Sequence, residues 1–110
     1  MQSKRTLQLA IPIEVKKRAA ARDSVQGWPC CVWCGKPAPT ENRLAYTNAH
    51  YTARSQGGRG VYENILTLCP ECHRQYDQSG KREEMRRFFR IYLTKLCAGW
   101  EETKLTYRRE

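Results

Sequence analysis

Residues 31–34 read Cys31-Val-Trp-Cys34, and residues 69–73 read Cys69-Pro-Glu-Cys72-His73. Each Cys-x-x-Cys pair sets two thiolates on a tight turn, and two pairs supply the four soft ligands that tetrahedral zinc prefers. Residues 35–68 lie between the pairs, which is more than the spacing of a simple zinc ribbon, so this insert is expected to fold as a hairpin that returns to its start. The sequence therefore predicts a structural Zn²⁺ bound by Cys31, Cys34, Cys69 and Cys72.

The cysteines also allow interpretations other than a four-cysteine zinc site. Residues 69–73 also fit the attachment pattern of c-type haem, but haem attachment requires export and leaves the first pair unexplained. Four free thiols, or a zinc site in which His73 replaces Cys31 or Cys34, are the remaining alternatives. Of the two other cysteines, Cys30 lacks the two-residue spacing to Cys34, and Cys97 falls on an apolar helical stripe, where a buried thiol is expected.

Length and charge narrow the class of protein. The chain has 110 residues, so we expect one domain over 1–110, whose modest core would gain from a structural metal. A formal charge of +9, from 20 Lys and Arg against 11 Asp and Glu, favours nucleic acid as a polyanionic partner, with an anionic membrane surface as the alternative. No apolar run in residues 1–10 resembles a signal peptide and no segment is long enough to span a bilayer, so a cytoplasmic protein with reduced thiols is expected.

The first half of the chain gives weak structural signals. Residues 1–10 suggest a flexible basic arm, and the proline at position 12 suits the first turn of a helix over 12–22. Gly27 and Pro29 indicate a turn over 23–29. A weak strand pattern at 44–52 leads into a glycine-rich loop.

The second half gives clearer signals. A strand is expected at 61–68, and a helix is expected to start at Pro70 and to end near 79–80. A last helix over about 81–97 is the clearest element, because its apolar residues recur at helical spacing: Met85, Phe88, Phe89, Tyr92, Leu93 and Leu96. The predicted fold class is therefore α+β.

His50 and His73 are available for chemistry, since four thiolates already complete a zinc tetrahedron. Ala49-His50-Tyr-Thr-Ala-Arg54-Ser-Gln-Gly57-Gly58, followed by Glu63-Asn64 and then by residues 69–73, resembles the motif of HNH endonucleases. The order His, Asn, His is kept, with the Gly-Gly loop and both zinc knuckles in place. The resemblance covers about residues 28–80, and the flanks are similar to small HNH proteins of phages and prophages, whose site of action is a bacterial host cell.

This resemblance implies a ββα-metal (His-Me finger) core, with two antiparallel strands and a helix around one catalytic divalent ion, between an N-terminal helix and a long C-terminal helix. By the family pattern, His50 is the general base that activates water, and a backbone carbonyl across the hairpin loop orients its ring. Asn64 ties that loop, and His73 binds the catalytic metal from the start of the helix. The implied activity is a metal-dependent DNA endonuclease that leaves 5′-phosphate and 3′-hydroxyl ends.

One position departs from the family pattern. Many HNH proteins carry Asp, Glu or His just before the general base as a further metal ligand, whereas this chain has Ala49. Asp77 stands four residues after His73 on the same helical face, an offset that relatives such as colicin nuclease domains use for a second ligand. We therefore expect His73 and Asp77 to hold Mg²⁺, Mn²⁺, Ni²⁺ or Zn²⁺. The alternatives are His73 with Asn64 or Asn48, a site completed by water and phosphate, or Asp77 as a carboxylate that only ends the helix.

Contacts to DNA are expected to be mainly with phosphates, which give affinity without sequence choice. Arg54, Arg59 and Arg74 stand close to the motif and are the candidate phosphate ligands. The arginines of the last helix form either a further phosphate-binding stripe or a solvated face paired with Glu83 and Glu84. The competing class of function is a non-catalytic, zinc-stabilised module that binds nucleic acid or protein. The sequence leaves the oligomeric state open, and a monomer with one site would nick DNA.

Overall fold

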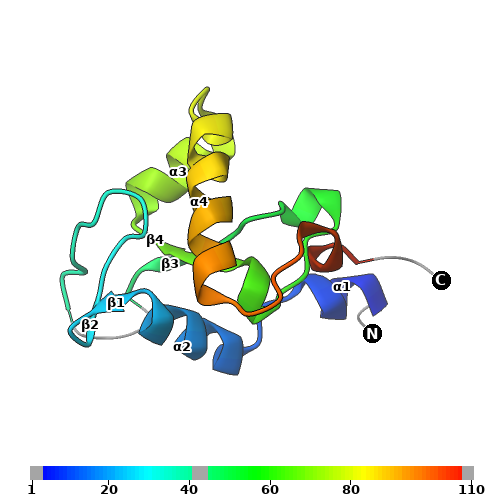
Figure 1. Cartoon of the computed structure of the whole chain (residues 1–110), viewed down its shortest axis with the longest axis horizontal. Helices are drawn as coiled ribbons and strands as arrows, with labels where there is room; N and C mark the ends of the chain where they lie inside the picture. The colour runs from blue at the N-terminus through cyan, green and yellow to red at the C-terminus, as the bar shows by residue number, and fades with distance from the viewer. Residues whose placement is uncertain (1–3, 41–44, 108–110) are drawn as a thin grey trace.

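A two-stranded antiparallel sheet and the helix that follows it form the centre of the fold. The structure is a computed structural model, and it describes residues 4–40 and 45–107. Strand β3 (Thr47–His50) pairs with β4 (Ile65–Leu68). Helix α3 (Pro70–Gln78) begins directly after β4, because Cys69 caps it and proline is well tolerated in a first helical turn. The predicted mixture of strands and helices is confirmed (Figure 1).

Both strands of this sheet are shorter than the sequence predicts. The chain leaves the ladder after His50, and the expected start of the first strand at position 44 lies outside the described residues. Ahead of β4, Tyr62–Asn64 form a single turn of 3-10 helix (η2), closed by a 2.9 Å hydrogen bond from Asn64 N–H to the Val61 carbonyl. All four residues of β4 are buried, including the polar Thr67, so this strand does not alternate between an apolar and a polar face.

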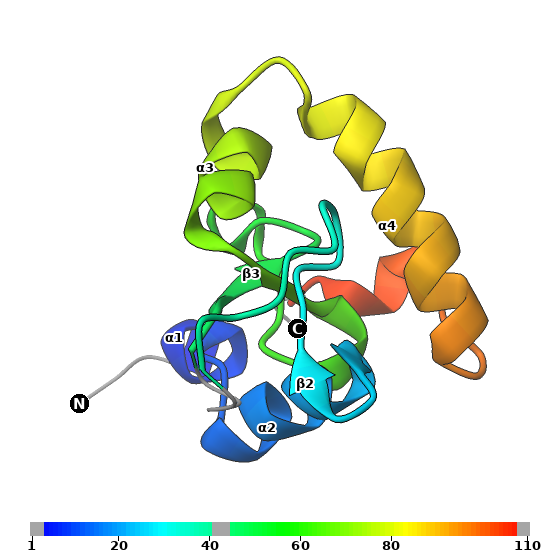
Figure 2. The ribbon, with the colours of Figure 1, turned by 90° about the vertical axis from the view of Figure 1, so that its left-hand side faces the viewer.

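Helix α4 (Arg82–Leu96) packs beside α3, and Figure 2 shows the two helices diverging from the turn that joins them. Its fully buried residues recur every four positions: Met85, Phe89 and Leu93. The predicted apolar stripe is too wide, since Phe88 and Leu96 are 43% and 47% exposed, and only a narrow face of the helix meets the core. Within residues 4–40 and 45–107, no helix combines the length and apolar character needed to cross a bilayer.

Helix α2 (Ile13–Arg22) contacts β4 and ends in a buried charge pair. The Arg22 guanidinium donates two hydrogen bonds to the Asp23 carboxylate, at 2.7 and 2.9 Å, and the two side chains are 5% and 0% exposed. The same carboxylate accepts the backbone N–H of Thr67 in β4 at 3.0 Å and the hydroxyl proton of Tyr92 in α4. One carboxylate therefore ties α2, the central sheet and α4 together.

The segment predicted as a turn over 23–29 is a complete small hairpin. Strand β1 (Ser24–Val25) pairs with β2 (Trp28–Pro29), and the two residues between them, Gln26 and Gly27, have φ angles of 52° and 82°. Two successive residues in the left-handed region are the geometry that a two-residue hairpin requires.

The prediction of a flexible arm over 1–10 is wrong for the residues that the structure describes. Lys4–Leu9 form helix α1, and residues 1–3 lie outside the described part of the chain. The Leu9 side chain is 1% exposed, and the N–H of Gly60 donates to the Gln8 carbonyl at 3.0 Å. The buried leucine and the contact to a distant loop both help to hold the helix, and neither appears in a local sequence pattern.

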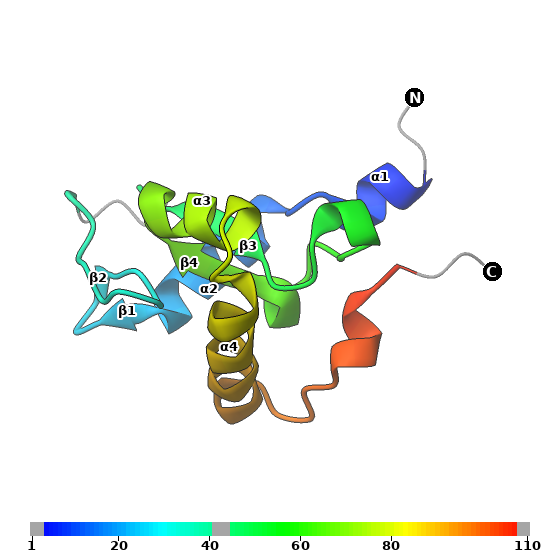
Figure 3. The same cartoon turned by 90° about the horizontal axis from the view of Figure 1, so that it is seen from above.

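The loop between the central strands receives segments from both ends of the chain. The loop contains the 3-10 helix η1 (Arg54–Gln56), and a further 3-10 helix, η3 (Glu102–Leu105), follows α4. Figures 1 and 3 show η3 (red) and α1 (dark blue) at the same end of the molecule as this loop. The contacts are hydrogen bonds, including Arg59 N–H to the Leu105 carbonyl at 2.7 Å and Tyr107 N–H to the Gly57 carbonyl at 2.7 Å.

Candidate active site and metal centre

The four paired cysteines meet in one cluster. The Sγ atoms of Cys31, Cys34, Cys69 and Cys72 all lie within 4.8 Å of one another, and those of Cys34 and Cys69 are 4.0 Å apart. Four sulfurs about 2.3 Å from a zinc ion lie about 3.8 Å from each other, so the cluster has the size of a tetrahedral thiolate site. The cysteines are arranged to bind a metal ion, and their soft donor set suits a structural zinc.

Backbone hydrogen bonds fix both knuckles of this cluster to the central sheet and helix. The N–H of Gly35 donates to the Cys31 carbonyl at 2.9 Å, and Gly35 adopts φ = 77°, a conformation that glycine tolerates without strain. The N–H of Val32 donates to the Thr67 carbonyl in β4 at 2.9 Å. The second knuckle is itself the first turn of α3, so the cluster joins the start of the hairpin insert to the start of α3.

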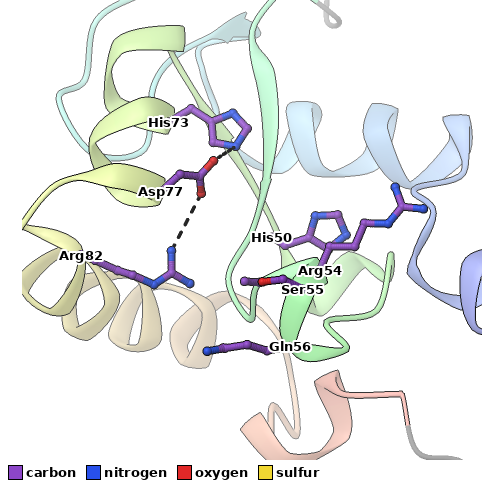
Figure 4. Close-up of a pocket in the computed structure, with 8 residues that line it drawn as sticks. His50, Arg54, Ser55, Gln56, His73, Asp77 and Arg82 are labelled. Atoms are coloured by element: carbon purple, nitrogen blue, oxygen red, sulfur yellow. Dashed lines mark ion pairs between the residues drawn. The ribbon is translucent and has the colours of Figure 1, made fainter.

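A cavity of about 420 Å³ opens beside this scaffold, between the end of β3, the segment at 53–56, α3 and the start of α4. Figure 4 shows His73 and Asp77 projecting from α3 toward the side on which His50 stands. The cavity thus brings together the two histidines and the aspartate that the sequence singled out. Its full lining is His50, Ala53, Arg54, Ser55, Gln56, His73, Asp77 and Arg82.

The ring of His73 is oriented by a hydroxyl from the neighbouring strand. Its Nδ1 lies 2.9 Å from the Thr47 Oγ1, and that hydroxyl donates its own proton to the Leu68 carbonyl at 2.7 Å. Since the Thr47 proton is already engaged, the hydroxyl can only accept from His73, and Nδ1 carries the imidazole proton. The lone pair of neutral His73 is therefore on Nε2, the nitrogen that faces Asp77.

His73 and Asp77 have the geometry of two ligands of one ion. His73 Nε2 lies 3.3 Å from the Asp77 carboxylate, and both side chains are partly exposed to the cavity. Donor atoms about 2.1 Å from a shared ion lie about 3.0 Å apart at a right angle and about 3.4 Å apart at the tetrahedral angle. Imidazole with carboxylate suits Zn²⁺, Ni²⁺ and Mn²⁺, and Mg²⁺ accepts the carboxylate with water. The residues present therefore fit a divalent ion.

The ring of His50 is oriented differently. Its Nε2 lies 3.0 Å from the backbone carbonyl of Leu9, at the end of α1. A carbonyl only accepts, so Nε2 carries the proton of neutral His50 and the lone pair is on Nδ1. Burial lowers the pKa of His50; the Leu9 carbonyl opposes this change, and the positive charge of Arg54 adds to it. The family resemblance implied a carbonyl from across the hairpin loop, and this expectation is wrong, because the partner comes from the N-terminal helix.

Asn64 connects the two ends of the loop that follows His50. Its side-chain oxygen accepts the N–H of Thr52 at 2.8 Å, and its side-chain nitrogen donates to the carbonyls of Arg59 at 2.8 Å and Thr52 at 3.2 Å. The residue is fully buried. Because its amide is fully engaged with the backbone, Asn64 is not available as a metal ligand, whereas its predicted part in holding His50 stays a prediction.

The predicted phosphate ligands are not all at the cavity. Arg54 lines it. Arg59 instead donates to the Lys104 carbonyl at 3.2 Å and lines a separate cavity beside the C-terminal segment. Arg74 is exposed on α3 and is not among the lining residues. Ala49 is fully buried in the core, so this position offers no metal ligand.

Arg82 is a cavity residue that the sequence did not single out. Its Nη1 donates to the Tyr76 carbonyl at 2.9 Å, its guanidinium lies 4.1 Å from the centre of the Tyr76 ring, and it stands 3.9 Å from Asp77. Figure 4 marks its ion pair with Asp77. The sequence placed Arg82 only among the arginines of the last helix, because the direction of the turn between α3 and α4 has no sequence signal.

Two of the other arginines on α4 are occupied by the C-terminal segment. Arg86 pairs with Glu102 and, at 3.7 Å, with Glu83. Arg90 lies 3.3 Å from Glu102. Thus Arg82 faces the cavity, whereas Arg86 and Arg90 anchor η3 against α4.

Comparison with known proteins identifies the kind of site. The profile of the HNH endonuclease family matches residues 31–79, which contain all four cysteines of the cluster as well as His50, Asn64, His73 and Asp77. The Type IV methyl-directed restriction enzyme EcoKMcrA of Escherichia coli (strain K12) is 29% identical over 97 residues, which cover 77% of this chain and 35% of that enzyme. The chain therefore spans about a third of the length of this curated relative.

Proposed function

Residues 31–79 form an HNH endonuclease domain, and on this premise we propose that the chain is a metal-dependent DNA endonuclease. Its reaction is hydrolysis of a phosphodiester bond, with 5′-phosphate and 3′-hydroxyl ends as products. We propose one catalytic unit in the whole chain, with the core at about 28–80. Only about a third of EcoKMcrA is covered, so the proposal concerns strand cleavage and leaves methyl-directed recognition to that enzyme.

The observation that carries this proposal is the pairing of two differently held histidines at one cavity. His50 has its lone pair on Nδ1 because Nε2 donates to Leu9. His73 has its lone pair on Nε2, next to Asp77, because Nδ1 donates to Thr47. A histidine at the end of β3 is thus set up as a base, and a histidine on α3 is set up as a ligand.

The proposed reaction follows from these roles. His73 and Asp77 hold a divalent ion, which when bound supplies Lewis-acid stabilisation of the charge on the phosphate and the leaving oxygen. His50 Nδ1 removes the proton of the attacking water, while Nε2–H stays donated to Leu9. Asn64 holds the loop that separates His50 from β4. Cys31, Cys34, Cys69 and Cys72 bind a structural zinc that fixes the start of α3.

Phosphate contacts are proposed for the cations around the cavity. Arg54 and Arg82 line it from two sides and suit bidentate contact with phosphate oxygens. Arg74 lies on the same helix as His73 and is proposed to contact the backbone further along the duplex. Arg59 is proposed as a peripheral contact, since its guanidinium is directed to the Lys104 carbonyl.

The test is cleavage of supercoiled plasmid by the zinc-loaded protein with Mg²⁺, Mn²⁺ or Ni²⁺. His50→Ala is expected to slow cleavage by about 10²- to 10⁴-fold, the usual contribution of a general base. Gln78→Ala, an exposed position at the end of α3 that does not line the cavity, is the matched control and is expected to cleave normally. Relaxed circles as the first product are expected from one site acting on one strand.

A different outcome would identify the alternative class of function. Ala49 is buried and supplies no ligand, which leaves open a non-catalytic, zinc-stabilised module that binds nucleic acid or protein. Zinc bound, DNA affinity intact and no metal-dependent cleavage would establish that module and exclude the nuclease.

A further inference from the structure

The acceptor that orients His50 comes from outside the HNH domain. Leu9 is the last residue of α1, and the matched domain begins only at residue 31. The contact of 3.0 Å between His50 Nε2 and the Leu9 carbonyl spans 41 positions of sequence. We propose that Leu9 is a positioning residue of the active site, and that docking of α1 sets which nitrogen of His50 faces the reaction. This inference rests on the proposed role of His50.

The chemistry of the contact explains why one carbonyl matters. Neutral imidazole has one N–H and one lone pair, and an acceptor beside Nε2 stabilises the form with the proton on Nε2. The lone pair is then on Nδ1, where it can take a proton from water. Once His50 has taken that proton, the same carbonyl accepts a hydrogen bond from a cationic ring, which is stronger than the bond to the neutral ring. Without this acceptor, neutral His50 would be a mixture of its two tautomers, with the lone pair on Nδ1 in one and on Nε2 in the other.

The end of α1 is also held by the loop that Asn64 organises. The last carbonyls of a helix lack partners within the helix. Here the Gln8 carbonyl accepts the N–H of Gly60 at 3.0 Å, and the Leu9 carbonyl serves His50. Asn64 donates to the carbonyl of the residue before Gly60, Arg59, at 2.8 Å. A continuous path of hydrogen bonds therefore runs from Asn64 through this loop to α1.

Close packing fixes the position of α1 against the loop that contains Gly60. A Cβ atom on Gly60 would lie 1.9 Å from the Ala10 carbonyl oxygen, so only glycine lets the backbone after α1 pass the loop. The Leu9 side chain is 1% exposed, whereas Leu7 on the same helix is 60% exposed. A six-residue helix is not stable alone, so α1 depends on tertiary contacts such as these for its order. The position of the His50 acceptor therefore depends on the Leu9 side chain and on Gly60.

The test compares Leu9→Ala with two matched variants in the zinc-loaded, full-length protein. Leu9→Met keeps a side chain of similar volume, and Leu7→Ala removes an exposed leucine from the same helix. The readouts are kcat and KM for plasmid cleavage, and the ¹⁵N shifts of the ring nitrogens. The chain has only two histidines, and a His73→Asn variant assigns their signals.

Leu9→Ala is expected to lower kcat by about 10- to 100-fold, part of the contribution of a general base, with KM unchanged. The His50 signals should move from the Nε2–H form toward a mixture of both forms. Leu9→Met and Leu7→Ala should keep both the wild-type kcat and the wild-type signals. If Leu9→Ala does not fold, Gly60→Ala displaces α1 without removing a core side chain, and the same changes are expected.

Two results would overturn the inference. The first is a His50 ring with its proton on Nδ1 in the wild-type protein. The second is an unchanged His50 tautomer and kcat in a folded Leu9→Ala or Gly60→Ala protein. The tautomer measurement does not need activity, so a wild-type protein that shows the Leu9-dependent Nε2–H form but cleaves nothing would refute the nuclease and leave the positioning contact intact.

Discussion

His50 and His73 differ in which ring nitrogen donates a hydrogen bond, and this difference suits them to different proposed roles. His50 donates from Nε2 to a backbone carbonyl, and His73 donates from Nδ1 to a hydroxyl whose own proton is already used. The free lone pairs are therefore on opposite nitrogens. Both partners lie outside the His, Asn, His pattern, so the surroundings of the two histidines assign their proposed roles.

Replacing the Thr47 hydroxyl tests the proposed ligand role of His73. Thr47→Val keeps the shape of the side chain but removes the acceptor for Nδ1, and loss of such an acceptor typically costs about 10- to 100-fold in metal affinity. We expect the Mn²⁺ concentration for half-maximal cleavage to rise by that factor, with the zinc content unchanged. Thr47→Ser keeps the hydroxyl and is expected to behave as wild type. An unchanged Mn²⁺ requirement in Thr47→Val would show that this hydroxyl does not orient a ligand.

The buried position of His50 predicts the pH dependence of cleavage. Burial lowers its pKa below the ordinary value of 6.5, and a general base acts in its deprotonated form, which is the form above the pKa. We expect kcat to be level near neutral pH and to decline only at a pH below 6.5. The measurement is a pH profile of kcat at two saturating Mn²⁺ concentrations, which must agree if metal loading is not limiting. An acidic decline centred above 6.5 would contradict this assignment.

The residues of the site were predictable where they lie close in sequence to a structural signal. His50, Asn64, His73 and Asp77 follow from the order of the motif and from helical spacing, and the cavity holds three of them. Leu9 and Arg82 were not predictable. Leu9 contacts His50 through its backbone carbonyl, across 41 positions of sequence. Arg82 reaches the cavity because of the direction of the turn before α4, which depends on packing.

Among the elements, α2, β4 and α4 are linked by one buried ion pair, and this gives a prediction about stability. Asp23→Asn preserves shape but leaves the Arg22 guanidinium, 5% exposed, without its charged partner. Removing one member of a buried pair typically costs about 3–5 kcal/mol, so we expect the free energy of unfolding to fall by about that amount. Urea unfolding of the zinc-loaded protein measures it.

Tyr92→Phe is the control for the same network. It removes only the hydroxyl that donates to Asp23, and loss of one hydrogen bond costs about 1 kcal/mol. Equal destabilisation by the two substitutions would show that the charge of Asp23 contributes nothing beyond its hydrogen bonds.

The sequence predicted the helices and strands whose signal lies in adjacent residues, and it missed those that depend on distant contacts. The last helix has apolar residues at helical spacing, and β4 has three apolar residues among its four; both were expected near their observed places. Helix α1 was not expected, because its order depends on Leu9 reaching the core and on Gly60 reaching its last turn. The hairpin of β1 and β2 was expected only as a turn, since each of its strands is two residues long.

For the whole molecule, the four-cysteine cluster predicts dependence on zinc. A small domain gains folding free energy from a structural metal, so we expect a strong chelator to abolish cooperative thermal unfolding. Zinc analysis should give one zinc ion more per chain for the wild type than for Cys34→Ser. Cys97→Ala, which removes a buried cysteine outside the cluster, should retain the ion. A chelated protein with an unchanged unfolding transition would exclude a structural role.

The arrangement of the chain ends around the 57–60 loop has a consequence for synthesis on the ribosome. Gly60 binds the first helix, while Gly57 and Arg59 bind Tyr107 and Leu105. The contacts of this loop cannot all exist until position 107 has left the exit tunnel, and contacts so distant in sequence form slowly. A nascent chain therefore carries His50 and His73 well before the loop between them is locked. The proposed active site is therefore complete only after translation has passed the last of these residues.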